Sequence, residues 1–477
     1  MIVRIKIKLA KLWGLLRRRS RPAETPVKGQ AVTLDAQEAL PSALDQSAGV
    51  NVRAQGDAGE SESRRASAVP SSRARVIIGL DFGTHSTKVV LRRRGDTRAR
   101  LFTPDIAIAC EQYSPLVTPS LVRIDQNRLY FGTSAHRQEG GNCFRSLKVQ
   151  LLTQTTELVT ADEYSPDVLV CCYFSWILSQ IKKELDLCYG SGNYRPLLNT
   201  AAPMAQIENQ LLKERYLRIV NVAWERVFVQ SNGMVEDGHE CGPLMSELAR
   251  ALKEATVPSR DVRAFDVLPE TIAPLVSLAR DPRMREGKHL VMDMGAGTTE
   301  FSINNVPARK DGRPILCFHD QSVLLGNERF EAEVDPSALV DELLRIAVET
   351  WHIGFEKERH ISLASKEKWK ALTVVLTGGG TRRDDVRRGI QRHRERMLYP
   401  WQGAAGTSYE VITHQPTEID ADGPTGGQLQ LDGFLLAVAH GLSYDRQTWP
   451  VVFNPDELAA VPELPTVTKD CDPWRDV

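Results

Sequence analysis

Residues 76–91 read Val-Ile-Ile-Gly-Leu-Asp-Phe-Gly-Thr-His-Ser-Thr-Lys-Val-Val-Leu, and this stretch decides the fold class. Two apolar runs, 76–80 and 87–91, flank a turn that contains glycine, which predicts a β-hairpin. Such a glycine lets backbone N–H groups approach phosphate oxygens without a Cβ in the way. Asp81 at the strand end could hold a hydrated Mg²⁺. The hairpin is therefore a candidate phosphate loop, and a plain hairpin turn is the alternative.

A second stretch has the same layout far along the chain. Residues 289–303 again run strand, aspartate, Gly-x-Gly, threonine and strand. One such loop is a weak signal, but two loops indicate two equivalent lobes that clamp one polyphosphate from opposite sides.

A third glycine-rich stretch follows a short predicted strand at 374–376. It contains Gly378, Gly379, Gly380 and Arg382. Glycines in this position allow a flat base or ribose to lie against the backbone. The planar guanidinium of Arg382 can stack on an aromatic base. The two hairpin loops do not match GxxxxGK[ST], and Asp81-Phe82-Gly83 lacks the companion motifs of a protein kinase.

Together and in this order, the three motifs resemble the phosphate-1, phosphate-2 and adenosine motifs of the actin, sugar-kinase and heat-shock ATPase superfamily. Within it, residues 76–445 look most like the nucleotide-binding domain of DnaK-type heat-shock chaperones. Residues 118–148 are similar to that family's small upper subdomain, which actin and the sugar kinases lack. The resemblance implies an α/β, two-lobed actin-like ATPase fold, made of duplicated ribonuclease H-like domains with a cleft for ATP.

The resemblance also implies roles for single residues in phosphoryl transfer from ATP to water. Asp81 and Asp293 would hold hydrated Mg²⁺, and Glu300 would face the metal. Lys148 would position the attacking water, Glu270 would orient it, and Thr298 would lie near the terminal phosphate. The other nucleotide contacts would come from Gly83, Thr84, His85, Lys88, Gly295, Ala296, Gly297, Gly378, Gly379, Gly380 and Arg382. The alternatives are a surface lysine at 148 and a solvated acid at 270.

Four positions depart from the chaperone pattern. His85 stands where the chaperones have a second threonine, Glu300 replaces an aspartate, and Ala296 replaces a glycine. Lys88 lies where actin carries a phosphate-contacting lysine, so two lysines compete for one role. These changes leave nucleotide binding expected and the rate of hydrolysis open.

The order of segments predicts the domain organisation. Helical periodicity covers 166–187, 205–229 and 337–357, and its alternation with strands indicates an α/β architecture. Residues 230–265 look like an insertion relative to the chaperones. The predicted parts are a basic amphipathic segment (1–21), a disordered linker (22–75), lobe I (76–270), lobe II with the adenosine motif (271–445) and a tail (446–477).

Composition and the N-terminal segment bear on location and partners. The net charge of −1 gives no argument for a nucleic-acid partner. The eight cysteines lack zinc spacing and are expected to be reduced thiols, which points to the cytoplasm. Residues 1–21 carry eight Lys or Arg and no acid. They predict contact with an anionic membrane surface, or a basic tail without a role.

Three functions follow, in order of preference. The first is a slowly hydrolysing, chaperone-like ATPase whose lobe closure is coupled to an unidentified protein partner. The tail is too short for the chaperones' peptide-binding β-sandwich. The second is a membrane-tethered filament protein of the bacterial actin type. The third is a small-molecule kinase, which needs a carboxylate base beside an acceptor hydroxyl.

Overall fold

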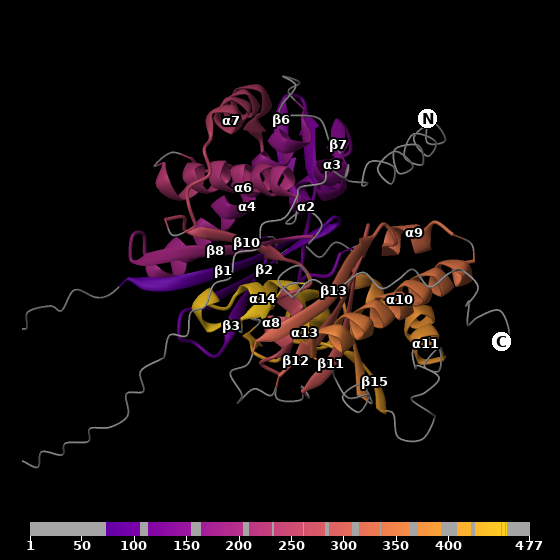
Figure 1. Ribbon diagram of the computed structural model, residues 1–477. Helices are drawn as coiled ribbons and strands as arrows, with labels where there is room; N and C mark the ends of the chain where they lie inside the picture. Colours follow the sequence, from indigo (N-terminus) through magenta and orange to yellow (C-terminus); the bar gives the residue numbers. More distant parts are fainter. Residues whose placement is uncertain are drawn as a thin grey trace, which may run out of the picture. The chain divides into compact units, whose positions relative to one another are not determined.

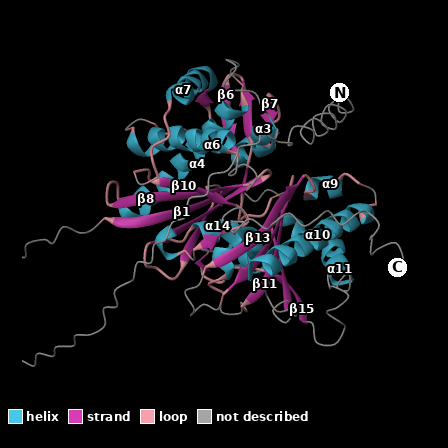
Figure 2. Ribbon diagram, viewed as in Figure 1, coloured by secondary structure: helices cyan, strands magenta, loops and turns pink. Residues whose placement is uncertain are grey.

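A computed structural model describes residues 73–455 except the gaps named at the end of this paragraph. The chain divides into units 1–69 and 70–477, and the description below concerns the second. The predicted membrane segment 1–21 lies outside the described residues, as do almost all of the linker and most of the tail. Strands and helices alternate, so the predicted α/β class is confirmed (Figure 2). The gaps are 105–112, 154–163, 204–208, 231–232, 261, 282–285, 308–313, 334, 363–370, 393–407, 421–424, 450 and 454.

The first sheet has seven strands in the order β10-β8-β1-β2-β3-β16, with β4 paired to β2. β1 and β2 are the predicted hairpin, and β8 and β10 extend the sheet in parallel beside β1. The strands are β1 (Ala74–Phe82), β2 (Ser86–Arg93), β3 (Ala99–Phe102), β4 (Thr118–Pro119), β8 (Tyr194–Ala202), β10 (Phe265–Pro269) and β16 (Ile419–Asp420).

The second sheet has six strands in the order β15-β14-β11-β12-β13-β17. β11 and β12 form the second predicted hairpin, and β14 and β15 extend the sheet in parallel beside β11. The strands are β11 (Gly287–Met294), β12 (Thr299–Val306), β13 (Ile315–Val323), β14 (Ala371–Thr377), β15 (Ser408–Thr413) and β17 (Val452–Phe453).

The two sheets share one topology. Each has a hairpin followed by a third antiparallel strand, and two parallel strands lie beside the first strand of the hairpin. One short parallel strand, β16 or β17, closes the other edge of each sheet. The chain therefore contains a structural repeat, which its two similar loops indicate in the sequence.

Long helices cover one face of each sheet (Figure 1). In the first sheet, alternate residues of β1 from Val76 to Phe82 pack under α4 (Pro166–Tyr189) and α6 (Gln210–Trp224). In the second, alternate residues of β11 from Leu290 pack against α10 (Ser337–Ser362) and α11 (Asp384–Arg392). The alternation follows from the two-residue period of a strand.

The predicted helices are present with shifted ends. α4 begins after Ser165, whose hydroxyl accepts a hydrogen bond from the Val168 N–H (3.4 Å), and it ends at Gly190, where φ is 80°. α6 begins later than predicted because the Asn209 side chain accepts from two backbone N–H groups. A π-helix, η1 (Glu225–Val229), directly follows it. The third helix extends to Ser362.

A small four-stranded sheet, β7-β5-β6-β9, lies with α7 at the top of Figure 1. Residues 122–144 supply three of its strands, and β9 and α7 lie within residues 230–265. These elements are β5 (Val122–Asp125), β6 (Arg128–Phe131), α2 (Gly132–Arg137), β7 (Asn142–Phe144), α3 (Leu147–Thr153), β9 (His239–Glu240) and α7 (Cys241–Glu254).

Two short helices join the remaining faces of the two large sheets. α8 (Ala273–Leu278) packs on the second sheet and α14 (Ala437–Leu442) on the first. They cross so closely that a Cβ on Gly441 would lie 1.8 Å from the Ala273 carbonyl oxygen. Among the described helices, none has the length and hydropathy that a bilayer span requires. The other short elements are α9 (Asn327–Glu331), η3 (Gly379–Arg382), α13 (Thr425–Asp432), η5 (Gly433–Leu436) and η6 (Arg446–Thr448).

The helix crossing predicts the effect of a single methyl group. Gly441→Ala should destabilise the fold by about 1–3 kcal/mol, because the added Cβ overlaps backbone that cannot move freely. Chemical unfolding measures the change. Gly427→Ala in α13 is the control, since its Cβ would meet no atom within 4 Å and alanine favours a helix. Equal stability of the two variants would contradict the crossing.

Candidate functional site

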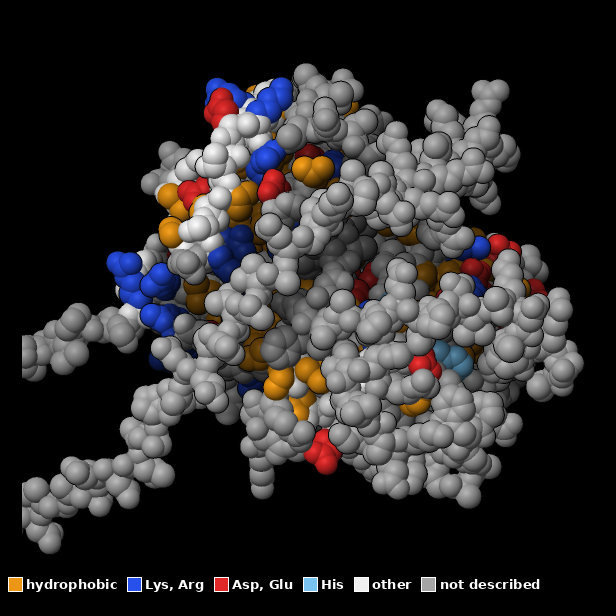
Figure 3. Space-filling model, viewed as in Figure 1, with side chains coloured by type: hydrophobic (Ala, Val, Ile, Leu, Met, Phe, Trp, Pro, Cys, Tyr) orange, Lys and Arg blue, Asp and Glu red, His pale blue; other side chains and the backbone are white. Residues whose placement is uncertain are grey.

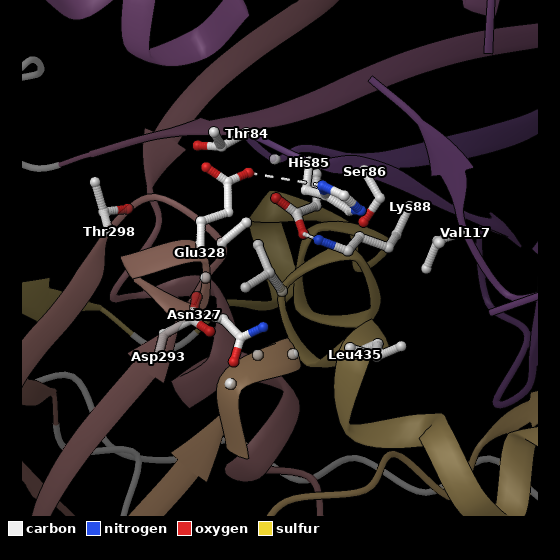
Figure 4. A pocket seen from close by; sticks show the side chains of 18 of the residues that line it. Thr84, His85, Ser86, Lys88, Val117, Asp293, Thr298, Asn327, Glu328 and Leu435 are labelled. Carbon is white, nitrogen blue, oxygen red and sulfur yellow. Dashed lines mark ion pairs between the residues drawn. The ribbon is translucent and has the colours of Figure 1, made fainter. Parts of the chain in front are cut away.

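A cavity of about 590 Å³ lies where the two hairpin turns meet, within the size range of small-molecule sites (Figure 4). Gly297 does not line it, but a Cβ there would lie 3.2 Å from the Thr84 methyl carbon, so the two turns touch. Every other predicted site residue lines the cavity: Asp81, Gly83, Thr84, His85, Lys88, Lys148, Glu270, Asp293, Gly295, Ala296, Thr298, Glu300, Gly378, Gly379, Gly380 and Arg382.

The two hairpin turns are built alike. The Gly83 N–H donates to the Ser86 carbonyl (3.2 Å), and the Gly295 N–H donates to the Thr298 carbonyl (2.8 Å). In the strand register, Asp81 lies opposite Lys88 and Asp293 lies opposite Glu300. The repeat thus puts residues of opposite charge at equivalent positions 88 and 300.

The third glycine-rich loop packs directly against the second hairpin. Gly378 has a φ of 81°, which favours glycine, and a Cβ there would lie 2.4 Å from Oδ1 of Asp293. The glycine therefore allows the end of β14 to approach the second aspartate at the cavity wall.

Four carboxyl groups line the cavity beside two lysines. Asp81, Glu270 and Glu300 are buried, at most 6% exposed, and Asp293 is half-buried. Lys88 Nζ lies 3.1 Å from Oδ2 of Asp81. Lys148 forms a buried ion pair with Glu270. With both lysines paired, the remaining carboxyls give the cavity a surplus of acid.

The Lys148–Glu270 pair joins distant segments. Lys148 lies in the first turn of α3, directly after Ser146 and Leu147, and Glu270 follows β10. Ser146 has a φ of 53°, a strained conformation for serine that costs on the order of 1–3 kcal/mol. Burial opposes the charge on Lys148, but Glu270 and Asp81 together raise its pKa. Burial also raises the pKa of Glu270, which Lys148 partly offsets. The pKa of Lys148 is therefore raised by the acids around it, whereas that of Glu270 is raised mainly by burial.

The pKa values of Glu300 and Asp293 are also raised. Burial, reinforced by Glu270, raises the pKa of Glu300 to about 8, although the Ser322 hydroxyl donates a hydrogen bond to its Oε1. Burial and nearby Asp81 raise the pKa of Asp293, which Lys88 partly lowers. Neither carboxyl therefore has a strong cationic partner of its own in the described chain.

The rim of the cavity contains residues that the motifs did not predict. The His85 ring stacks on Tyr113 with centroids 4.6 Å apart. Its Nδ1 lies 3.7 Å from Oε1 of Glu328 in α9, and Figure 4 marks this pair with a dashed line. The rim thus joins the first hairpin to an element of the second sheet's half. His85, Tyr113 and Glu328 come from three separate segments, so no local sequence pattern indicates that they meet.

The glycine-rich third loop ends at a partly apolar wall. The guanidinium of Arg382 pairs with Asp432 and lies 5.8 Å from the Phe434 ring centroid. Phe434 and Leu435 also line the cavity. An aromatic base could lie against this wall, and Phe434 is a contact that the sequence pattern missed.

Comparisons with known proteins leave the site to be interpreted from its geometry. No protein-family model matches the chain, and no curated protein matches it significantly. Within the part of the chain that is described, no three His, Cys, Asp or Glu side chains are grouped as direct ligands of one metal.

The shift at Glu300 predicts how stability depends on pH. A carboxyl whose pKa is 4.5 in the unfolded chain and about 8 in the folded chain lowers stability as pH rises through that window. Glu300→Gln removes this loss and keeps an acceptor for Ser322. The free energy of unfolding of this variant should exceed that of the wild type only slightly near pH 5, and by roughly 2–4 kcal/mol above pH 8.

Urea unfolding from pH 5 to 8.5 in EDTA measures the difference. Glu342→Gln, on an exposed position of α10, is the control and should change stability by less than about 0.5 kcal/mol at every pH. A gain at Glu300 that does not vary with pH would contradict the shift.

Proposed function

We propose that the chain is an ATP-binding, slowly hydrolysing ATPase of the actin, sugar-kinase and heat-shock superfamily, with two lobes whose closure is coupled to a protein partner. One observation carries the proposal. Two sheets of equal topology each present an aspartate and a tight hairpin turn to one cavity. A symmetric pair of phosphate loops around a single polyphosphate is the arrangement that this repeat supports.

The residues fit Mg²⁺ together with a nucleotide. The surplus of buried carboxyls requires a cation or protons, and Mg²⁺ takes one or two carboxylates while keeping several waters. Asp81 and Asp293 would hold the hydrated ion. Glu300 lies beside Asp293 on the next strand, where its bond from Ser322 occupies one oxygen. When bound, Mg²⁺ would offset charge on the phosphates.

The two lysines would have different roles. Lys88 is already tied to Asp81 at 3.1 Å, so it supports that carboxylate. Lys148 is buried, and its pKa is raised, so its ammonium group is charged. This positive charge could neutralise the negative charge that develops on the terminal phosphate. Glu270, held by Lys148, would orient the attacking water. The turns at Gly83 and Gly295 would offer backbone N–H groups to the phosphates.

The adenosine would lie between the third loop and the Phe434 wall. The backbone lines the cavity without side chains at Gly378, Gly379 and Gly380. Arg382 lines the same cavity. Closure of the lobes about the α8–α14 crossing would tighten the cavity around a bound nucleotide and change the surface that a protein partner meets.

The alternatives gain no specific support. Filament assembly and small-molecule phosphorylation need, respectively, a self-contact surface and a base beside an acceptor hydroxyl, and neither is identified among the described residues. Membrane contact through residues 1–21 remains a prediction, because that segment lies outside the described residues, and a cytoplasmic location remains one too.

Mg-ATP should raise the melting temperature of the full chain. Saturation to about 100 times the dissociation constant adds roughly 2.7 kcal/mol of stability. Asp293→Asn should lose the Mg²⁺-dependent part of this gain, because an amide does not replace the negative charge that holds the ion. Differential scanning fluorimetry with ATP, ADP and GTP, each with Mg²⁺ or EDTA, measures the effect.

Asp96→Asn, an exposed change in the β2–β3 turn, is the matched control and should respond as the wild type does. Glu270→Gln should keep the Mg-ATP shift while phosphate release falls by about 10²-fold or more. If none of the nucleotides raises the melting temperature, the proposal is wrong. ATP consumption that requires an added metabolite would favour the kinase alternative instead.

A further inference from the structure

A second hollow, of about 530 Å³, lies on the α14 face of the first sheet and shares no lining residue with the cavity above. Ile77 and Leu197 form part of its wall, and Arg260, Arg263 and Arg446 surround Asp266 inside it. We call it the arginine groove. It joins the edge of the sheet to the turn that follows α14.

The charges inside the groove do not balance. Arg263 donates to Oδ1 of Asp266 (2.9 Å), Arg260 lies 3.5 Å from Oδ2, and Arg446 pairs with the same carboxylate. Three guanidinium groups therefore share this one acid. The groove's other acid, Asp445, pairs with Arg94 at 2.6 Å, so arginines still outnumber acids there. The Arg263 side chain is only 9% exposed, and its Nε has no hydrogen-bond partner among the described residues. A buried donor without an acceptor costs about 1–3 kcal/mol.

Further arginines continue the groove along the sheet. Arg75 and Arg195 are exposed and lie directly opposite each other on β1 and β8. Each is two residues from a groove residue on its own strand, so both share that face of the sheet. Like charges directly opposite are destabilising. Lys and Arg side chains gather at the left of Figure 3, where these strands begin.

The chemistry of the groove selects a carboxylate-rich peptide. Arginine binds carboxylates through paired N–H donors, and apolar wall residues favour a ligand with apolar side chains between its charges. Residues 456–477 of this chain fit that description. They contain six acidic and two basic residues, with Val461, Leu464 and Trp474 among them.

We propose that the acidic segment 456–477 docks in the arginine groove. Opposite net charge favours the contact, whereas the basic segment 1–21 would be repelled. The segment can reach, because Arg446 lies in the groove and residue 455 is only nine residues further along the chain. An extended chain covers up to about 3.6 Å per residue, so residues beyond 455 are long enough to reach back to the groove.

Tethering makes even weak contacts effective. A segment linked to its site experiences an effective concentration on the order of millimolar. Docking would satisfy Arg263, offset the repulsion between Arg75 and Arg195, and close the groove to acidic partners. The inference does not depend on nucleotide binding.

Hydrogen–deuterium exchange of the full chain tests the docking. Amides of 456–477 should exchange at least about tenfold more slowly than in an unstructured peptide at 50 mM NaCl, and should lose this protection at 500 mM. The groove variant Arg260→Gln/Arg446→Gln and the tail variant Glu463→Gln/Asp470→Asn/Asp472→Asn should both lose it. The tail variant changes no residue of the described fold, so it remains informative if the groove variant is unstable.

Arg250→Gln, an exposed change on α7, is the matched control and should keep the protection. A fluorescent polyglutamate peptide separates self-docking from capture of an external acidic partner. It should bind the tail variant about tenfold more tightly than the wild type, because the wild-type groove is occupied. Equal binding to the two proteins, or a tail unprotected in the wild type, would overturn the proposal.

Discussion

Buried acid at the junction of the two hairpins constrains the rest of the site. Asp81, Glu270, Asp293 and Glu300 line one cavity, and the nearby lysines are each committed to one of them. Several carboxylates close together cannot all remain ionised away from water unless a cation compensates them. The raised pKa values of Asp293 and Glu300 follow from this constraint. A site that keeps such a surplus is suited to a ligand that arrives with its own divalent cation.

The structural repeat explains both the likeness and the difference between the two halves of the cavity. Equal strand order gives each half a hairpin turn, an aspartate and a residue opposite that aspartate. In the first half this residue is Lys88, which neutralises its aspartate. In the second it is Glu300, which adds to the acid. The repeat supplies a symmetric frame, and the charges at these positions make the two halves chemically distinct.

The sequence was most informative where structure is local. The hairpins and long helices follow from residue periodicity, glycine turns and capping side chains such as Asn209, so their positions were predictable to within several residues. The predicted site residues come together because strand ends carry them to one place. Residue patterns indicated the repeat only at the two loops. Its extension over both sheets was expected from the resemblance alone, because strand pairing between distant segments leaves no local pattern.

The missed residues have the same physical cause. Tyr113, Glu328 and Phe434 join the cavity from segments far apart in the chain, and a stacked ring or a surface carboxylate looks ordinary in its own sequence context. The arginine groove is similar, since Arg446 and Asp266 meet only after α14 has packed on the first sheet. The buried state of Glu270 also needed the structure, since the sequence left a solvated acid open.

The most direct test of the account is a crystal structure of the full chain with Mg²⁺ and a non-hydrolysable ATP analogue. The account predicts the triphosphate between the turns at Gly83 and Gly295, with hydrated Mg²⁺ near Asp81 and Asp293. Lys148, rather than Lys88, should lie nearest the terminal phosphate. An analogue bound outside this cavity, or Lys88 turned to the terminal phosphate with Lys148 still closed on Glu270, would contradict it.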